Sequence, residues 1–470
     1  MIIGDYFFQI PKELPKLEML SFYYLIFIFG IFLLSRVFKA RLRPFVLLAA
    51  NLVFLYSFSL YHLLLLCELA MAGYLCSLLL IYKKNKPFLF LSVIVILAVL
   101  CFFKFQGYFH ISITIPLGLS YVTFKLISYF ADVYSGKTQG TRNPIYFLDY
   151  VLFFPVITAG PINRFDPFYK TLKKPQSFDY RSAKNGGFQL MLGIFEKKVF
   201  CDYLSDVSSK ALASGLGGMN TLLAVVLYSF IIYLDFDSIS NMAIGSAKLL
   251  GFELPKNFNS PYLSASIREF WTKWHISLST WFRDYVYIPL GGNRKGKFRQ
   301  YLFIIIVFVL SGIWHGSTIN FVLWGFLHGL LRIIEDLVFR PFSGIGGTGK
   351  KIIRPFGIAL NFFLVTFLWL FFRYQTTGEA LTILKSILTF KPLSLAEIGM
   401  TINERYWLVV ILFCVFVTDY LRSRFDMTET YAKLPFPLRW LGYALLIVVF
   451  LIFGVYGGSH AASDFIYQFF

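Results

Sequence analysis

The sequence predicts an all-α polytopic membrane protein, with roughly 11–13 transmembrane or re-entrant helices around a central funnel or chamber. Of its 470 residues, 57% are hydrophobic and only 15% are charged, whereas a soluble domain carries about a quarter charged residues. Apolar runs long enough to cross about 30 Å of hydrocarbon recur along the whole chain. These observations exclude an ordinary soluble enzyme.

Each candidate crossing is an apolar run bounded by polar or basic residues. The runs are residues 18–35, 44–60, 62–82, 87–105, 111–131, 145–160, 187–205, 219–235, 301–317, 318–338, 355–373, 405–421 and 438–456. Some are short or interrupted by Pro and Gly, such as residues 115–120, which is typical of re-entrant or half-buried segments. We interpret residues 1–470 as a single transmembrane domain.

The net charge of +19 indicates membrane topology and not nucleic-acid binding. The basic residues cluster in short loops between apolar runs, at 36–43, 82–86, 293–299, 350–354 and 421–425. Lys and Arg concentrate in this way on the cytoplasmic side of membrane proteins, where they also attract anionic headgroups. The bilayer is therefore a predicted partner, and nucleic acid is not.

Residues 235–300 are the least hydrophobic stretch with dense polar chemistry. Within a membrane, polar and irregular backbone persists only where protein buries it or where it lines a watery cavity. We therefore expect this segment to line a funnel. Ser264 or Ser266 is positioned to cap a helix that begins near residue 266 and continues until Pro289 and the following Gly pair end it.

Two Trp-His pairs are the candidate functional residues, in "FWTKWHISLST" (270–280) and "SGIWHGS" (311–317). On one continuous helix, His275 shares a face with Trp271 and Leu278, whereas Trp274, Trp281 and Tyr285 occupy a second face. His315 ends an apolar run, and an ionisable residue inside the membrane is a functional candidate by default. The alternative for each histidine is structural packing, which we favour for His328.

At this point the chain resembles a known family. The segments "NFNSPYLSASIREFWTKWHISLSTWFRDYVYIPLGGNRKG" and "SGIWHGSTINFVLWGFLHG" are similar to the membrane-bound O-acyltransferase (MBOAT) superfamily, specifically its bacterial alginate O-acetyltransferase-like branch. Three further segments agree, "PLGLSYVTFKLISYFADVYSG", "FFPVITAGPINRF" and the terminal "SDFIYQFF". Where relatives usually read Asp-Phe-Ser-Gly-Tyr-Ser-Asp, this chain has "DFDSISN" at 235–241, which bears on the acceptor or partner more than on the chemistry.

The resemblance implies the MBOAT fold, a catalytic role for His315 and a supporting role for His275. It also implies a reaction chamber with several further residues in its lining, for which we name Trp274, Trp314, Arg164, Arg283, Asp284 and Asn259. An ion pair between Arg283 and Asp284 that simply holds the helix is the alternative for those two residues.

The chemistry of the residues agrees with acyl transfer. Such a reaction needs a base for the attacking hydroxyl and donors for the oxyanion, and neutral imidazole suits the first task. His315 is the predicted base, while His275 positions the acceptor or binds the oxyanion, and the Trp rings exclude water. We expect no metal site, because two histidines with Glu269 or Asp284 lack a ligand spacing typical of metals.

We expect an O-acetyltransferase of the bacterial inner membrane that modifies an exported or cell-wall polysaccharide. The sequence has no nucleotide-binding motif, so the acetyl group arrives as a thioester, acetyl-CoA, and no permanently bound cofactor is expected. Arg294, Lys295 and Lys297 are candidates for attracting the phosphates of coenzyme A, and a positive-inside anchor is the alternative. An extracytoplasmic acetyltransferase is the expected protein partner, because the acceptor lies outside the membrane.

Two other functions remain open at the level of sequence. Within the same class, the chain is compatible with a D-alanyl transferase for teichoic acids, whose donor is a carrier-protein thioester. From another class, a transporter or channel is the alternative, although secondary transporters usually show internal repeats. Turnover of labelled acetyl-CoA would distinguish an enzyme from solute flux.

Overall fold

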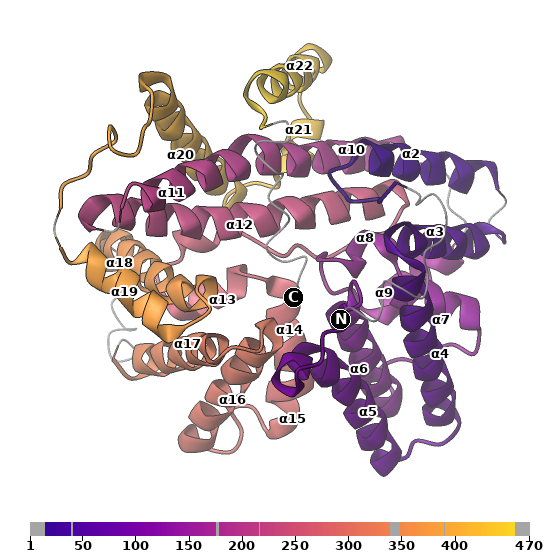
Figure 1. Ribbon diagram of the computed structural model, residues 1–470. Coiled ribbons are helices and arrows are strands. Elements are labelled where there is room, and N and C mark those ends of the chain that lie inside the picture. The colour runs from indigo at the N-terminus through magenta and orange to yellow at the C-terminus, as the bar shows by residue number, and fades with distance from the viewer. Residues whose placement is uncertain are drawn as a thin grey trace. The chain divides into compact units, whose positions relative to one another are not determined.

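All regular secondary-structure elements in the described part of the chain are helices. The structure, a computed structural model, describes residues 15–38, 41–174, 178–215, 217–338, 348–389 and 391–455, with the backbone alone for 348–352. Within these residues every regular element is an α-, 3₁₀- or π-helix (Figure 1). The prediction of an all-α membrane protein is therefore confirmed.

The packing of the backbone divides the described chain into two compact units. The first contains the chain up to Ile194 together with Ile239–Pro255, and the second contains Phe195–Ser238 and the chain from Lys256 onward. Helix α12 (Gly218–Leu249) contributes residues to both units. The single domain expected over residues 1–470 stays a prediction.

The first unit is built from hydrophobic helices with short polar connections. Its elements are α2 (Phe22–Val37), α3 (Arg43–Phe58), α4 (Leu60–Tyr82), α5 (Lys86–Phe105), η1 (Gln106–Phe109), α6 (Leu119–Ser135), α7 (Pro144–Val151), α8 (Phe154–Ile157), α9 (Phe165–Lys173) and most of α10 (Tyr180–Phe195). Polar side chains define several helix starts: Ser21, Ser59 and Asn85 each accept a backbone N–H from the first turn of the helix that follows. Such caps satisfy N–H groups that a helix cannot bond internally.

The second unit holds both predicted histidines and most of the segment expected to line a funnel, of which residues 239–255 belong to the first unit. The elements of the second unit are η2 (Glu196–Cys201), α11 (Asp202–Ala213), much of α12, η3 (Pro261–Leu263), α13 (Ile267–Lys273), α14 (Ile276–Phe282), η4 (Arg283–Tyr287), α15 (Ile288–Leu290), α16 (Lys297–His315), α17 (Ile319–Val338), α18 (Thr348–Arg373), α19 (Thr377–Ile387), α20 (Ile402–Arg422), α21 (Met427–Ala432) and α22 (Phe436–Phe453). Both η2 and η4 are π-helical turns, which are frequent at functional sites.

Six helices among the described residues are long and apolar enough to cross a membrane. They are Leu60–Tyr82, Lys86–Phe109, Gly218–Leu249, Lys297–His315, Ile353–Arg373 and Phe436–Phe453, and two shorter apolar helices are Phe22–Val37 and Arg43–Phe58. Some predicted runs take another form: residues 145–160 hold the two short helices α7 and α8, and the run expected from 111 becomes helical only at Leu119. Pro155 at the start of α8 contributes to that division, because proline favours the first turn of a helix.

Candidate active site

The hairpin of α16 and α17 carries His315 into the interior of the second unit. The two helices run side by side (Figure 1), and glycines allow their backbones to touch. A Cβ atom on Gly312 would lie 2.1 Å from the carbonyl oxygen of Phe321, and one on Gly325 would lie 2.2 Å from that of Phe308. This contact fixes the last turn of α16, so that its final residue, His315, is only 4% exposed.

Three aromatic rings surround the imidazole of His315. The ring centroids of Trp314, Trp324 and Phe372 lie 4.6, 5.2 and 5.1 Å from that of His315, and all three meet it edge to face. These neighbours come from α16, α17 and α18, and each is buried. The sequence thus places an ionisable side chain in a buried aromatic cage formed by these three rings.

His275 lies at a break between two short helices, and the prediction of one continuous helix from residue 266 was wrong. Ser266 caps α13 as expected, but that helix ends at Lys273, and His275 adopts the left-handed conformation with φ 41°. The segment before η3 supplies the reason, because its backbone replaces helical hydrogen bonds. The N–H of Asn259 donates to the carbonyl of Lys273 at 3.1 Å, and the N–H of Ile276 donates to that of Asn257 at 2.9 Å.

Asn257 also holds the side chain of His275. Its Oδ1 lies 3.4 Å from Nδ1 of His275 and accepts a hydrogen bond of 2.6 Å from the hydroxyl of Ser277. An amide oxygen only accepts, so a hydrogen bond across this contact is made by the tautomer that carries its proton on Nδ1 and its lone pair on Nε2. Burial lowers the pKa of His275 to about 3, and the ring is therefore neutral at physiological pH.

Trp314 is the residue that connects the two histidines. Its ring centroid is 6.3 Å from that of His275 and 4.6 Å from that of His315. On its other side His275 meets the ring of Phe236 edge to face at 4.5 Å. The two Trp-His pairs of the sequence therefore form one cluster, in which Trp314 touches both imidazoles.

The break at His275 changes the faces that sequence periodicity predicted. Trp274 stacks on Phe270 at 5.4 Å and contacts Trp369 at 4.9 Å, so it belongs to the aromatic packing next to the histidine cluster. Trp271 points to α17, where its indole N–H donates to Nδ1 of His328 at 3.3 Å. The faces assigned on a continuous helix were therefore wrong.

His328 packs between helices, as the sequence favoured, and it also lies close to the cluster. It is fully buried, and its ring lies 5.0 Å from that of Trp324, which in turn meets His315. The bond from Trp271 makes Nδ1 the acceptor, so Nε2 carries the proton. Among the described residues, neither this Nε2 nor the indole nitrogen of Trp324 has a hydrogen-bond partner, which leaves two buried donors beside the cage of His315.

Within the second unit, Arg283, Asp284 and Asn259 are not grouped with the histidines. Arg283 and Asp284 pair with each other at 2.9 Å at the start of η4. The ion pair that was the alternative to a chamber role is thus present, with 59% and 28% of the two side chains exposed. Asn259 is exposed, and Asn257 contacts His275 instead. Arg164 precedes α9 in the first unit, and its place in a chamber stays a prediction.

The predicted basic loop is exposed. Arg294, Lys295 and Lys297 all face solvent, and Lys297 approaches Asp336 on α17 at 3.4 Å. This exposure suits either the attraction of phosphates or an anchor at the membrane surface. Both interpretations stay predictions.

Glu269, considered above as a metal ligand, instead binds neighbouring groups of the fold. Although burial raises its pKa, hydrogen bonds from Arg354, the backbone of Ala265 and Lys273 outweigh that effect and lower the pKa to about 2. The carboxylate therefore stays ionised and links the first turn of α13 to Arg354 of α18.

A buried ion network was missed by the sequence analysis. The π-helical turn η2 directs Lys197 toward α12, where its Nζ lies 2.7 Å from Asp235, and the same Nζ lies 3.1 Å from Asp202 at the start of α11. All three side chains are at most 5% exposed. Charges within apolar helices are costly unless paired, and this was the signal available in the sequence.

Further ion pairs link this region to α20. The acidic residues Asp235 and Asp237 flank Phe236 in the sequence, and the ring of Phe236 contacts His275. Arg422 forms ion pairs with Glu196 and with Asp237. Asp235 and Asp237 thus anchor the turn of α12 that carries Phe236. The "DFDSISN" segment, where the chain departs from the usual family pattern, therefore positions a ring against His275.

The fold and the site together define a multi-pass membrane protein with two buried histidines on one indole. Residues 141–377 match the family described as "MBOAT, membrane-bound O-acyltransferase family". This match covers half of the chain and includes both histidines, so the chain belongs to the MBOAT family. The expected enzyme class is thereby confirmed, and a transporter is not supported.

Curated relatives indicate which members of the MBOAT family this chain resembles. The chain is 35% identical over 343 residues to "Probable alginate O-acetylase AlgI" of Pseudomonas syringae pv. tomato, a match that covers 67% of this chain and 63% of the relative. It is 31% identical over 362 residues to the "Peptidoglycan O-acetyltransferase" of Helicobacter pylori, with 68% of each chain covered. A "Teichoic acid D-alanyltransferase" of Streptococcus thermophilus is 32% identical over 254 residues, covering 50% of this chain and 60% of the relative. The match thus spans a little under two thirds of the alginate relative.

Proposed function

We propose that this protein transfers an acetyl group from a cytoplasmic thioester, acetyl-CoA, toward hydroxyls of an exported or cell-wall polysaccharide. The observation that carries the proposal is the meeting of His275 and His315 on Trp314, inside the segment that matches the MBOAT family. The similarity to relatives named for alginate and peptidoglycan O-acetylation supports the acetyl group and the class of acceptor.

His315 acts as the general base in this proposal. Its neutral imidazole takes the proton of the attacking hydroxyl as the new C–O bond forms. The tetrahedral intermediate then collapses, the C–S bond breaks, and the departing thiolate takes the proton from the imidazolium. The aromatic cage of Trp314, Trp324 and Phe372 supports the proposal because it keeps out water, which would otherwise hydrolyse the thioester.

His275 positions the acceptor hydroxyl. With Nδ1 protonated toward Asn257, its Nε2 accepts a hydrogen bond but does not donate one. Of the two roles that the sequence left open, this tautomer favours orientation of the hydroxyl over donation to the oxyanion. The left-handed backbone at His275 aims the ring, and the bonds from the 257–259 segment hold that conformation.

Donor and acceptor lie on opposite sides of the membrane in this proposal. The exposed Arg294, Lys295 and Lys297 attract the phosphates of acetyl-CoA on the cytoplasmic side. An extracytoplasmic acetyltransferase partner then completes the transfer to the polysaccharide. A cysteine introduced at 295 should react with impermeant maleimide only after the inner membrane is opened, and labelling in intact cells would contradict this orientation.

D-alanyl transfer to teichoic acid is the second candidate. The similarity to the Streptococcus thermophilus protein favours it, although that match covers a smaller part of the chain. The catalytic histidines would have the same roles, and only the acyl group, its carrier and the acceptor would differ.

A reconstitution experiment tests the proposal. The purified protein in lipid vesicles is given a soluble hydroxyl acceptor together with radiolabelled acetyl-CoA, or with D-alanyl thioester on a carrier protein, and thiol release is measured. Turnover of acetyl-CoA that disappears in His315→Ala is the expected result. Turnover of the D-alanyl thioester alone would favour the second candidate, and turnover of neither donor would overturn both. Efficient acetylation of added polysaccharide by the protein alone would contradict the need for a partner.

A further inference from the structure

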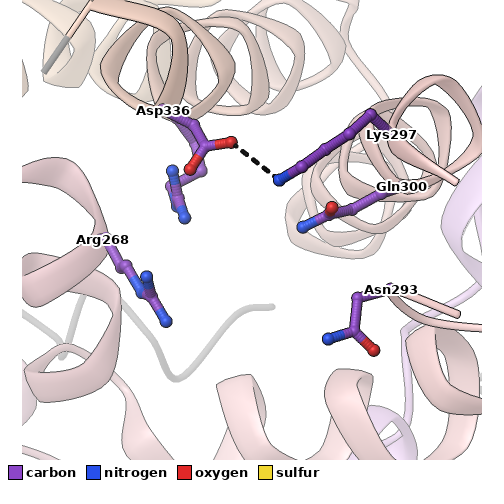
Figure 2. Close-up of a pocket in the computed structure, with 6 residues that line it drawn as sticks. Arg268, Asn293, Lys297, Gln300 and Asp336 are labelled. Atoms are coloured by element: carbon purple, nitrogen blue, oxygen red, sulfur yellow. Dashed lines mark hydrogen bonds and ion pairs between the residues drawn. The ribbon is translucent and has the colours of Figure 1, made fainter. Parts of the chain in front are cut away.

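A polar hollow lies on the second unit where α13, α16, α17 and the loop before α16 meet. Its volume is about 410 Å³, which is within the usual range for small-ligand pockets. Figure 2 shows the side chains of Arg268, Asn293 and Gln300 turned toward the same open centre. We call this hollow the basic pocket, and its lining consists of Arg268, Asn293, Lys297, Gln300, Arg332 and Asp336.

The lining of the basic pocket has a surplus of positive charge. Its one carboxylate, Asp336, is already engaged by Lys297 at 3.4 Å and by the hydroxyl of Tyr301 at 2.8 Å. The charge of Arg332 also acts on Asp336, and the backbone N–H of Arg268 donates to the carboxylate of Glu335 at 2.9 Å. In the part of the chain that the structure describes, neither guanidinium makes a hydrogen bond or an ion pair with another side chain. Two planar cations are thus available to an anion, and the arginine fork matches the oxygens of a phosphate.

The first turn of α16 adds to the attraction for an anion. The helix begins at Lys297, and the preceding Gly296 supplies no side-chain cap. The N–H groups of such an uncapped turn carry a partial positive charge that favours phosphate. The amides of Asn293 and Gln300 supply further donors at the same place.

The position of the pocket indicates which anions reach it. Helix α16 is one of the six that are apolar and long enough to cross a membrane, and the pocket lies at its first turn. The adjoining Arg294, Lys295 and Arg299 are exposed, as expected at the headgroup level of the cytoplasmic leaflet.

We propose that the basic pocket binds a phosphate ester at the membrane surface. Two sources share this chemistry: the headgroup of an anionic phospholipid, and the phosphates of a coenzyme A thioester. The second source rests on the proposed function, whereas the first does not. A bound phosphate would bridge α13, which leads to His275, and α16, which ends at His315, and so would fix the two histidine-bearing segments relative to each other.

Binding measurements on the full chain test this proposal. Affinities of the detergent-purified protein are measured for dioctanoyl phosphatidylglycerol, for coenzyme A and for dioctanoylglycerol, which lacks phosphate. The double variant Arg268→Gln/Arg332→Gln removes the two guanidiniums that line the pocket. The double variant Arg41→Gln/Arg424→Gln removes two exposed positive charges that do not line the pocket and serves as its matched control. The single variant Arg268→Gln, at an exposed position, replaces the first double variant if that one fails to fold.

The wild-type protein should bind at least one phosphate probe and not dioctanoylglycerol. The pocket variant should weaken that binding by about 10- to 100-fold, because it loses charge-assisted bonds to the phosphate, while the control should change it less than about twofold. Loss of phosphatidylglycerol binding alone assigns the pocket to lipid, and loss of coenzyme A binding alone assigns it to the donor. Binding of neither probe, equal weakening by both double variants, or unchanged binding in the pocket variant would each overturn the proposal. None of these readouts uses acyl transfer, so failure here is distinct from failure of the proposed function.

Discussion

The substitution Gly312→Ala tests how the hairpin of α16 and α17 positions His315. A real Cβ essentially never approaches another atom closer than 3.0 Å, but here it would lie 2.1 Å from the carbonyl oxygen of Phe321. That oxygen is backbone and has no rotamer to adopt. The two helices must therefore separate by about 1 Å, and a displacement of about 1 Å at an active site can cost about 100-fold in rate.

The direction in which the melting temperature changes distinguishes an effect of packing from an effect of helix propensity. Alanine is favoured over glycine inside a helix by about 1 kcal/mol, so propensity alone predicts a higher melting temperature for Gly312→Ala. Overpacking costs about 1–3 kcal/mol and predicts a lower one. We expect the lower melting temperature together with the loss of acetyl transfer.

The matched control is Gly378→Ala in α19, where a new Cβ meets no atom within 4 Å. It should melt at or above the wild-type temperature and keep its transfer activity. The assay is thiol release from acetyl-CoA in vesicles, with melting followed in detergent. A Gly312→Ala protein that melts no lower than the wild type and transfers acetyl at the wild-type rate would show that this contact does not position His315.

The remaining predictions concern the support of His275 and the buried charges. Replacing Asn257 by Ala should reduce transfer by about tenfold or more in the vesicle assay, because it leaves buried polar partners unsatisfied; an unchanged rate would remove Asn257 from the site. Asp235→Asn should lower the free energy of unfolding by about 3 kcal/mol, since it breaks a buried pair with Lys197, whereas Asp206→Asn, at a more exposed pair, should cost less than about 1 kcal/mol; equal melting temperatures would contradict this. The pKa of His275 is lowered to about 3 from an ordinary value of 6.5, so the unfolded chain binds its proton first and stability should fall as pH drops from 6.5 toward 3. His275 contributes about 1.4 kcal/mol per pH unit to this slope, and His275→Gln should reduce the slope by about that amount in melting curves recorded across that range.

The sequence was sufficient for the class of fold because membrane crossing depends on local composition. Apolar runs and basic loops are visible without tertiary structure, and the six crossing helices fall on runs predicted in this way. The paired Trp-His motifs also predicted both histidines of the cluster. Local sequence patterns therefore predicted the membrane-crossing helices and the two candidate histidines.

The structure differs from the sequence predictions where distant backbone competes with the helix. A continuous helix through His275 was the natural reading of its periodicity, but the 257–259 segment bonds to Lys273 and Ile276 and interrupts it. For the same reason Asn257, and not Asn259, holds the histidine. The spacing of residues within 266–290 does not predict these competing hydrogen bonds, because their partners lie outside that segment.

The ion network was hidden for a similar reason. Its partners lie on η2, α12 and α20, so Arg422 is more than 180 residues from Asp237 in sequence. The π-helical turn that carries Lys197 has no sequence signature that we recognised. Long-range pairing of this kind is determined by tertiary packing and cannot be predicted from one chain by periodicity.

The role of His315 as general base is the central claim, and one measurement tests it most directly. Wild-type protein and His315→Ala are reconstituted at equal amounts, shown to be equally folded by their melting temperatures, and compared for thiol release from radiolabelled acetyl-CoA with acceptor present. We predict a loss of about 10²- to 10⁴-fold, as is typical when a general base is removed. Near-normal transfer by a folded His315→Ala protein would contradict the claim.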